Sequence, residues 1–161
     1  MSHASPEARL AAAGFALPSA PVPRGMYAPS CMVSGQAGRW IAISGQTCRQ
    51  DGIAIAGICH GEYDVADARL AAEVAMLNAL AALRDACGGQ LDRVAQVMRL
   101  RGFIRASADF AHHPAVLDAA SAVLCVAFPG QLLPARSAVG VASLPSHAWI
   151  EIEIDAWALA G

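Results

Sequence analysis

The sequence predicts an α+β two-layer sandwich, in which one mixed sheet carries two helices on a single face. Residues 148–158 alternate strictly between apolar and polar side chains, as in a strand with one buried face. Two segments, 64–87 and 109–128, repeat apolar residues at helical spacing. The predicted elements follow the order β-β-α-β-α-β-β, which favours two helices packed on one side of a sheet.

The first 26 residues are expected to form a short helix and an extended arm, and residues 27–161 a single domain. Ser5 and Pro6 are typical of the first turn of a helix, and Gly14 is typical of its end. The proline-rich run 17–23 indicates extended, polyproline-like backbone. A mass of 16.6 kDa suits one domain with one core.

A β-hairpin is predicted next, from residues 32–34 and 40–44 joined by a four-residue loop at 35–38. Ser44-Gly45-Gln46 would end the second strand of this hairpin. An irregular segment is expected to follow as far as Tyr63, with a short extra strand at 53–55.

The first long helix is predicted to begin at Asp64 or Asp67 and to end near Cys87, before a Gly-Gly pair. Its many alanines would let it pack closely on a sheet. Asn78 within it is expected to make a structural hydrogen bond. The apolar positions at helical spacing are Leu70, Val74, Leu77, Leu80, Ala81 and Leu83.

A strand at 94–104 is predicted to precede the second helix. That helix would begin near Asp109 or around Pro114 and end before Pro129. The strand would place Met98, Leu100 and Ile104 on one face and Arg99, Arg101 and Phe103 on the other.

The last two strands, 137–142 and 148–158, are expected to pair as a hairpin across a Leu-Pro-Ser turn. This pairing would bring Arg136 and Glu151 toward the same end of the hairpin. An arginine can clamp a small carboxylate with two parallel hydrogen bonds. Carboxylates about 7 Å apart along one strand face raise each other's pKa values, which suits acid–base chemistry. The alternatives are an exposed loop arginine and a solvated acidic face.

The composition is 56% hydrophobic and 15% charged, with a mean hydropathy of +0.43. No uninterrupted apolar run reaches the roughly 18 residues that a membrane span requires. The excess apolar surface therefore predicts subunit interfaces and no membrane partner. A net charge of −2 without a Lys/Arg cluster argues against a nucleic-acid partner.

The five cysteines lie far apart and include no Cys-x-x-Cys pair. This pattern favours a cytoplasmic protein without a disulfide framework. His112-His113 and Cys59-His60 lack further ligands at metal-binding spacing, so no metal site is predicted.

Seven short motifs occur in one order along the chain. They are Gly25-Met26-Tyr27, Ser44-Gly45-Gln46, Asn78-Ala79-Leu80, Asp109-Phe110, Pro134-Ala135-Arg136-Ser137, Leu144-Pro145 and Ile150-Glu151-Ile152-Glu153. Together they resemble the Rid family of reactive intermediate deaminases, also called YjgF or L-PSP endoribonuclease-like proteins. The resemblance runs from about Tyr27 to Trp157. The long N-terminal arm and the Ala-Arg-Ser-Ala-Val-Gly-Val run are similar to a less characterised branch.

This resemblance implies a chorismate-mutase-like fold and a homotrimer with three clefts between subunits. By motif, Arg136 would grip a substrate carboxylate, and Glu151 would position the water that attacks a 2-imino acid, which gives a 2-keto acid and ammonia. Tyr27 and Ser44 would shape the pocket. Ala138 stands where archetypal deaminases carry a cysteine, so only backbone contacts would remain there.

Two functions follow as expectations. The first is an enzyme that hydrolyses the imine or enamine of a small acid without metal or organic cofactor, because an imine carbon is already electrophilic. The alternative is a non-catalytic member of the same fold that binds a small carboxylate or regulates a partner. The retained Arg136 and Glu151 favour the enzyme, whereas Ala138 favours the binding protein. The family's ribonuclease name fits the acidic pI poorly.

Overall fold

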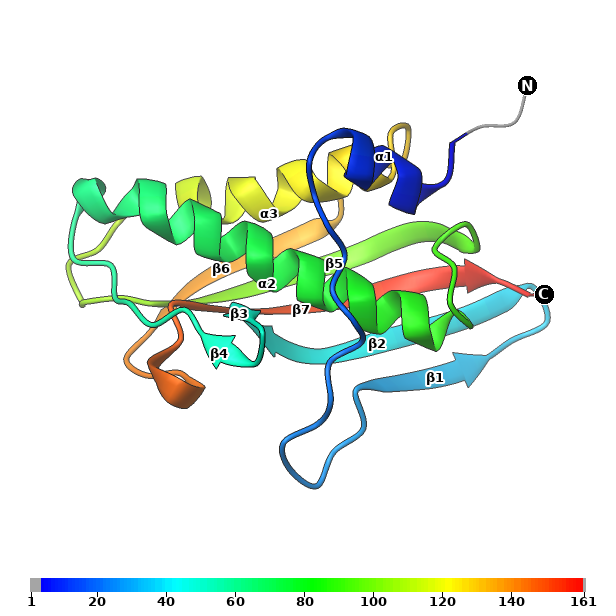
Figure 1. Ribbon diagram of the computed structural model, residues 1–161, viewed down its shortest axis with the longest axis horizontal. Helices are drawn as coiled ribbons and strands as arrows, with labels where there is room; N and C mark the ends of the chain where they lie inside the picture. The colour runs from blue at the N-terminus through cyan, green and yellow to red at the C-terminus, as the bar shows by residue number, and fades with distance from the viewer. Residues whose placement is uncertain (1–3, 161) are drawn as a thin grey trace.

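The computed structural model describes residues 4–160 and shows a five-stranded sheet with helices on one face (Figure 1). Residues 1–3 of the predicted N-terminal segment 1–26 and residue 161 of the predicted domain 27–161 lie outside the described part. The elements are α1 (Pro6–Ala12), β1 (Ser30–Ser34), β2 (Gly38–Thr47), β3 (Arg49–Gln50), β4 (Ile53–Ala54), α2 (Val65–Ala86), β5 (Val94–Arg105), α3 (His113–Ala127), β6 (Ala135–Val141) and β7 (Ile150–Leu159). The predicted α+β fold and the order of its core elements are confirmed.

The main sheet has the strand order β1-β2-β7-β5-β6. β5 and β6 run parallel, and the other neighbours are antiparallel, so the sheet is mixed as predicted. The β1–β2 hairpin is confirmed, although Gly38 belongs to β2 rather than to the loop. The extra strand predicted at 53–55 is β4, which pairs with β3 in a separate small sheet.

The expected hairpin between the last two strands is wrong, because β5 lies between β6 and β7. The chain leaves β5, forms α3 on one face and returns as β6 parallel to β5, which is the usual path of a β-α-β crossover. Arg136 therefore has Leu100 as its partner on β5, and Leu100 faces Ile154 on β7. All three positions share the helix-covered face of the sheet.

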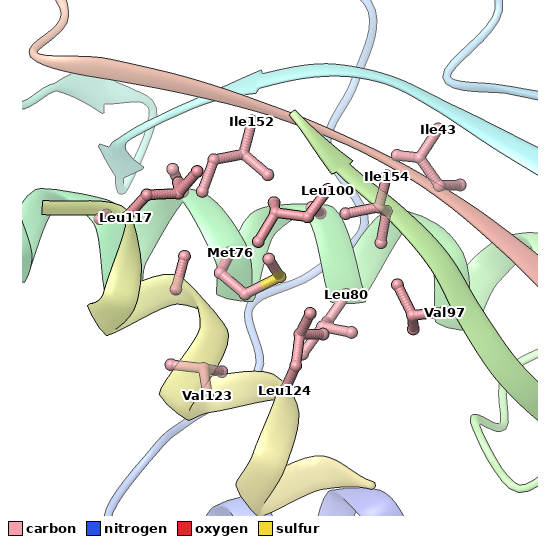
Figure 2. Packing of buried hydrophobic residues seen from close by; sticks show 14 of the residues in the cluster. Ile43, Met76, Leu80, Val97, Leu100, Leu117, Val123, Leu124, Ile152 and Ile154 are labelled. Atoms are coloured by element: carbon pink, nitrogen blue, oxygen red, sulfur yellow. The ribbon is translucent and has the colours of Figure 1, made fainter. Parts of the chain in front are cut away.

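The core lies between this face and the helices (Figure 2). The alternation predicted for β7 is confirmed, since Ile150, Ile152 and Ile154 are buried. Figure 2 shows Leu100 and Ile152 beside Met76, a residue of α2. Residues on β5, β7, α2 and α3 thus contribute to one continuous core.

Two positions predicted for the apolar faces lie elsewhere. Leu70 is 60% exposed, because α2 turns an alanine-rich face that includes Ala72 and Ala75 toward the core. Met98 is also exposed, because the pairing of β5 with β7 is irregular between Val97 and Arg99. This irregularity places Val97 in the core instead of Met98.

The N-terminal helix α1 is confirmed and joins the helical layer by packing on α3. The Ser5 hydroxyl caps it by accepting a hydrogen bond from the backbone N–H of Ala8. Leu10 is fully buried, and the Arg9 guanidinium donates to the carbonyl of Ala127 at 2.7 and 2.9 Å. The arm that follows crosses α2, where Arg84 donates to the carbonyl of Pro18 at 2.9 Å. No helix within residues 4–160 has the length and apolar character needed to cross a membrane.

The close packing of β5 and α3 depends on Gly102, where an added methyl group would overlap the Leu117 side chain. Gly102→Ala should lower the free energy of unfolding by about 1–3 kcal/mol, the usual cost of overpacking. Urea denaturation at one protein concentration measures this loss. The cost should shrink when Leu117→Ala is already present, because that change removes the overlapping side chain. An equal cost in both backgrounds would contradict the contact.

Candidate functional site

A β-bulge at Ser44-Gly45 is the main irregularity of β2. The pairing with β7 shifts between Ile43 and Gln46, so Ser44 and Gly45 together lie opposite the single residue Glu153. The Ser44 hydroxyl donates to the carbonyl of Ala28 at 2.7 Å and ties the bulge to the end of the N-terminal arm. A Cβ atom at position 45 would overlap the carboxylate of Glu151, so the glycine lets the Glu151 side chain lie against the bulge. The Ser-Gly-Gln motif therefore makes room for an acidic side chain.

Glu151 projects from β7 onto the face of the sheet that the helices do not cover. It is half-buried and lies opposite Thr47 of β2. Within residues 4–160, no hydrogen bond or ion pair holds its carboxylate. Burial raises the pKa of Glu151, and the nearby negative charge of Glu153 raises it further. Glu153 itself is paired with Arg101 at 2.8 Å.

Three of the predicted site residues line one cavity of about 490 Å³. Tyr27 reaches it from the N-terminal arm, Ser44 from the bulge and Glu151 from β7. Pro145, in the turn before β7, forms part of the same wall. The structure therefore gathers a phenol, a hydroxyl and a carboxyl of raised pKa around one space.

Arg136 and Ala138 lie outside this cavity, on the helix-covered side of the sheet. Nη1 of Arg136 donates to Asp118 at 2.6 Å and to the Ser121 hydroxyl at 3.0 Å, both on α3. Ala138 is partly buried against the core and pairs with Gly102. Because Glu151 projects from the opposite face, one chain does not bring Arg136 and Glu151 together, contrary to the expectation from the hairpin.

Asn78 makes the structural hydrogen bond that the sequence suggested. Its side chain is buried on α2, and Nδ2 donates to the carbonyl oxygens of Thr47 and Arg49, both at 3.0 Å. These bonds fix the backbone at the end of β2 and the start of β3. Asn78 thus positions the strand segment that lies opposite Glu151.

The cavity is also lined by Arg24 and Arg49, two residues that the sequence patterns did not identify as site residues. Arg24 lies in the N-terminal arm and Arg49 in the two-residue strand β3, and neither segment shows hydrophobic periodicity. Their proximity to two of the short motifs, Gly25-Met26-Tyr27 and Ser44-Gly45-Gln46, is the signal that could have pointed to them. No group of three or more His, Cys, Asp or Glu side chains in residues 4–160 could hold a metal ion.

The fold and the cavity define a class of small α+β proteins whose acidic site lies at a bulge on the open face of one sheet. Residues 7–140 match the family described as "YjgF/chorismate mutase-like, putative endoribonuclease". The chain belongs to this family, which confirms the resemblance seen in its motifs.

Individual relatives agree with this assignment. Protein TCP17 of Trypanosoma cruzi is 32% identical over 148 residues, which cover 91% of this chain and 89% of the relative. The crystal structure of a "putative endoribonuclease" from Shewanella oneidensis has a TM-score of 0.86 and 30% identity, and covers 96% of this chain and 99% of its own. The Agrobacterium tumefaciens protein Atu1372, of unknown function, has a TM-score of 0.83 and 33% identity, with 95% and 92% covered.

The raised pKa of Glu151 predicts a pH-dependent effect on stability. The folded state holds the Glu151 proton more tightly than the unfolded state, so this group stabilises the fold below its usual pKa of about 4.3. That contribution is lost as the pH rises through the folded-state pKa. Glu151→Gln should therefore gain stability relative to the wild type as the pH rises across this window. Urea denaturation at a series of pH values measures the difference.

Glu153→Gln is the control for the electrostatic part of this effect. It removes the neighbouring negative charge but leaves Glu151 in place, so the pKa of Glu151 should fall toward its usual value. Carbon-13 NMR titration of the glutamate carboxyl groups reads this pKa directly. A Glu151 carboxyl that titrates like a free glutamate in the wild type would contradict the assigned burial.

Proposed function

We propose that this protein hydrolyses a reactive 2-imino acid, or the corresponding enamine, to a 2-keto acid and ammonia. The observation that carries this proposal is Glu151. Its side chain is half-buried at the wall of the cavity, its pKa is raised, and no hydrogen bond or ion pair within residues 4–160 holds its carboxylate. General acid–base catalysis is most effective when the pKa of the group lies near the working pH. The upward shift brings the pKa of Glu151 closer to a neutral working pH, which suits a general acid–base group.

In the proposed reaction, Glu151 accepts a proton from water while the water oxygen bonds to the imine carbon. The electron pair of the C=N double bond moves to nitrogen, which gives a tetrahedral carbinolamine. Glu151 then returns its proton to the nitrogen. The C–N bond breaks as the hydroxyl oxygen forms the carbonyl, and the hydroxyl proton passes to the departing nitrogen, which leaves as ammonia. One water is consumed, and no electrons are transferred to a cofactor. Tyr27 and Ser44 shape the pocket around the reacting carbon.

The substrate carboxylate is assigned to Arg136 of a neighbouring copy of the chain, in a homotrimer with clefts between subunits. β6 is an edge strand, so Arg136 lies at a boundary that a second copy can approach. The uncovered sheet face exposes Trp40 and Val139, which suits burial in an assembly. Arg136 uses Nη1 toward α3, and a guanidinium carries further donors on Nη2 and Nε. The backbone at Ala138 is assigned to contact the same carboxylate.

A non-catalytic carboxylate-binding protein is the second candidate, favoured by Ala138, which stands where archetypal deaminases carry a cysteine. A ribonuclease function is disfavoured, because the net charge is −2 and the sequence has no Lys/Arg cluster. All five cysteines are free thiols, consistent with a reducing compartment such as the cytosol.

Glu151→Gln keeps the shape of the side chain and removes the carboxylate that acts as the base. This variant therefore distinguishes the proposed enzyme from a protein that only binds carboxylates. Hydrolysis of short-chain imino acids, generated in situ by an amino-acid oxidase, should fall by about 10²–10⁴-fold. Binding of the product keto acid should change little, because Arg136 holds its carboxylate. Keto-acid appearance above the spontaneous rate measures the first quantity, and calorimetry measures the second.

Glu153→Gln is the matched control, since it removes a carboxylate from the same strand face two residues away. It should slow hydrolysis much less than Glu151→Gln. A wild-type protein that binds keto acids but does not accelerate imine hydrolysis for any side chain would reject the enzyme and leave the binding protein.

A further inference from the structure

Two arginines converge beside Glu151. Nη2 of Arg24, on the N-terminal arm, and Nη1 of Arg49, in β3, both donate to the carbonyl oxygen of Gly52, at 3.0 and 3.1 Å. Both arginines line the cavity that contains Glu151. Two like charges that share one neutral acceptor repel each other, so the arrangement is costly unless an anion lies nearby.

Neutral groups hold the Arg49 side chain in place. Nε donates to the Thr47 hydroxyl at 3.0 Å, and Nη2 donates to the Ser146 hydroxyl at 2.8 Å. Thr47 lies directly opposite Glu151 in the sheet, so the guanidinium is bound to the residue that pairs with the proposed base. Ser146 has a left-handed backbone with φ of 54°, a conformation that costs energy for a residue other than glycine. In this strained conformation, the Ser146 hydroxyl accepts the hydrogen bond from Arg49.

Neither arginine has a carboxylate partner within residues 4–160. The ion pairs that arginines form in this part of the chain involve Arg101 and Arg136. Asp51 lines an adjoining cavity of about 650 Å³, which Arg24 and Arg49 also border, but it forms no ion pair with them. A guanidinium that is held by neutral acceptors and lacks a counterion is prearranged for an anionic ligand.

We propose that Arg24 and Arg49 form a second anion subsite beside Glu151, and that the substrate is a 2-imino dicarboxylic acid. This inference rests on the proposed imine hydrolysis and names its substrate class. Arg136 of a neighbouring copy holds the carboxylate next to the reacting carbon. Arg24 and Arg49 hold the second carboxylate, at the far end of a short carbon chain. Monocarboxylic imino acids leave this second subsite empty and bind more weakly.

Calorimetry with the full-length protein and stable keto acids tests the subsite without depending on catalysis. The wild type should bind 2-oxoglutarate about tenfold to a hundredfold more tightly than 2-oxopentanoate, which has the same carbon chain but lacks the second carboxylate. Arg24→Gln and Arg49→Gln should each reduce this preference, while binding of 2-oxopentanoate stays nearly constant. Arg93→Gln is the control, because it removes an exposed arginine at the opposite end of β7.

Arg24→Gln keeps the test decisive if Arg49→Gln fails to fold, because Arg24 is exposed and its guanidinium makes one hydrogen bond, to Gly52. Equal affinity for the two acids, no binding of either acid, or a preference that survives Arg24→Gln would overturn the subsite. Tighter binding of 3-phosphonopyruvate than of 2-oxoglutarate would show that the second subsite prefers a phosphorus-containing acid. This result would overturn the proposal that the substrate is a dicarboxylic acid. Arginine-dependent binding of 2-oxoglutarate without imine hydrolysis would support the subsite and reject the proposed function alone.

Discussion

Strand β7 lies between β2 and β5 and buries Ile150, Ile152 and Ile154, so a shift of one residue would turn every one of these side chains to the open face. The same constraint forces Glu151 onto that open face. There its carboxylate lies against Gly45, in the bulge of β2, and becomes partly buried. The register of one strand therefore determines both the core and the raised pKa at the candidate site.

Local features of the fold could be predicted because they follow from periodicity and from turn residues. The buried face of β7, the β1–β2 hairpin and the three helices are of this kind. Strand neighbours could not be predicted in the same way, because alternation identifies the buried face of a strand and carries no information about its partner. β6 and β7 follow each other in the sequence, yet the crossover through α3 places β5 between them.

The candidate site shows the same division. Tyr27, Ser44 and Glu151 were identified from short motifs, and they line one cavity. Arg136 was identified in the same way, but its place depends on the strand order, and one chain holds it on the other face of the sheet. Arg24 and Arg49 belong to no periodic pattern, since the N-terminal arm and the two-residue strand β3 bring them to the cavity. Their significance depends on the hydrogen bonds that converge on Gly52.

The central claim is that a complete site takes Arg136 from one copy of the chain and Glu151 from another, and mixed assemblies test it most directly. Arg136→Ala and Glu151→Gln chains carrying different tags are co-expressed, and oligomers that contain both are purified. Each variant alone should be nearly inactive. In a cyclic trimer that contains both chains, one cleft in three receives both intact residues, so imine hydrolysis should recover to about one third of the wild-type rate. Mixed oligomers that stay as inactive as the two parent variants would contradict the shared site.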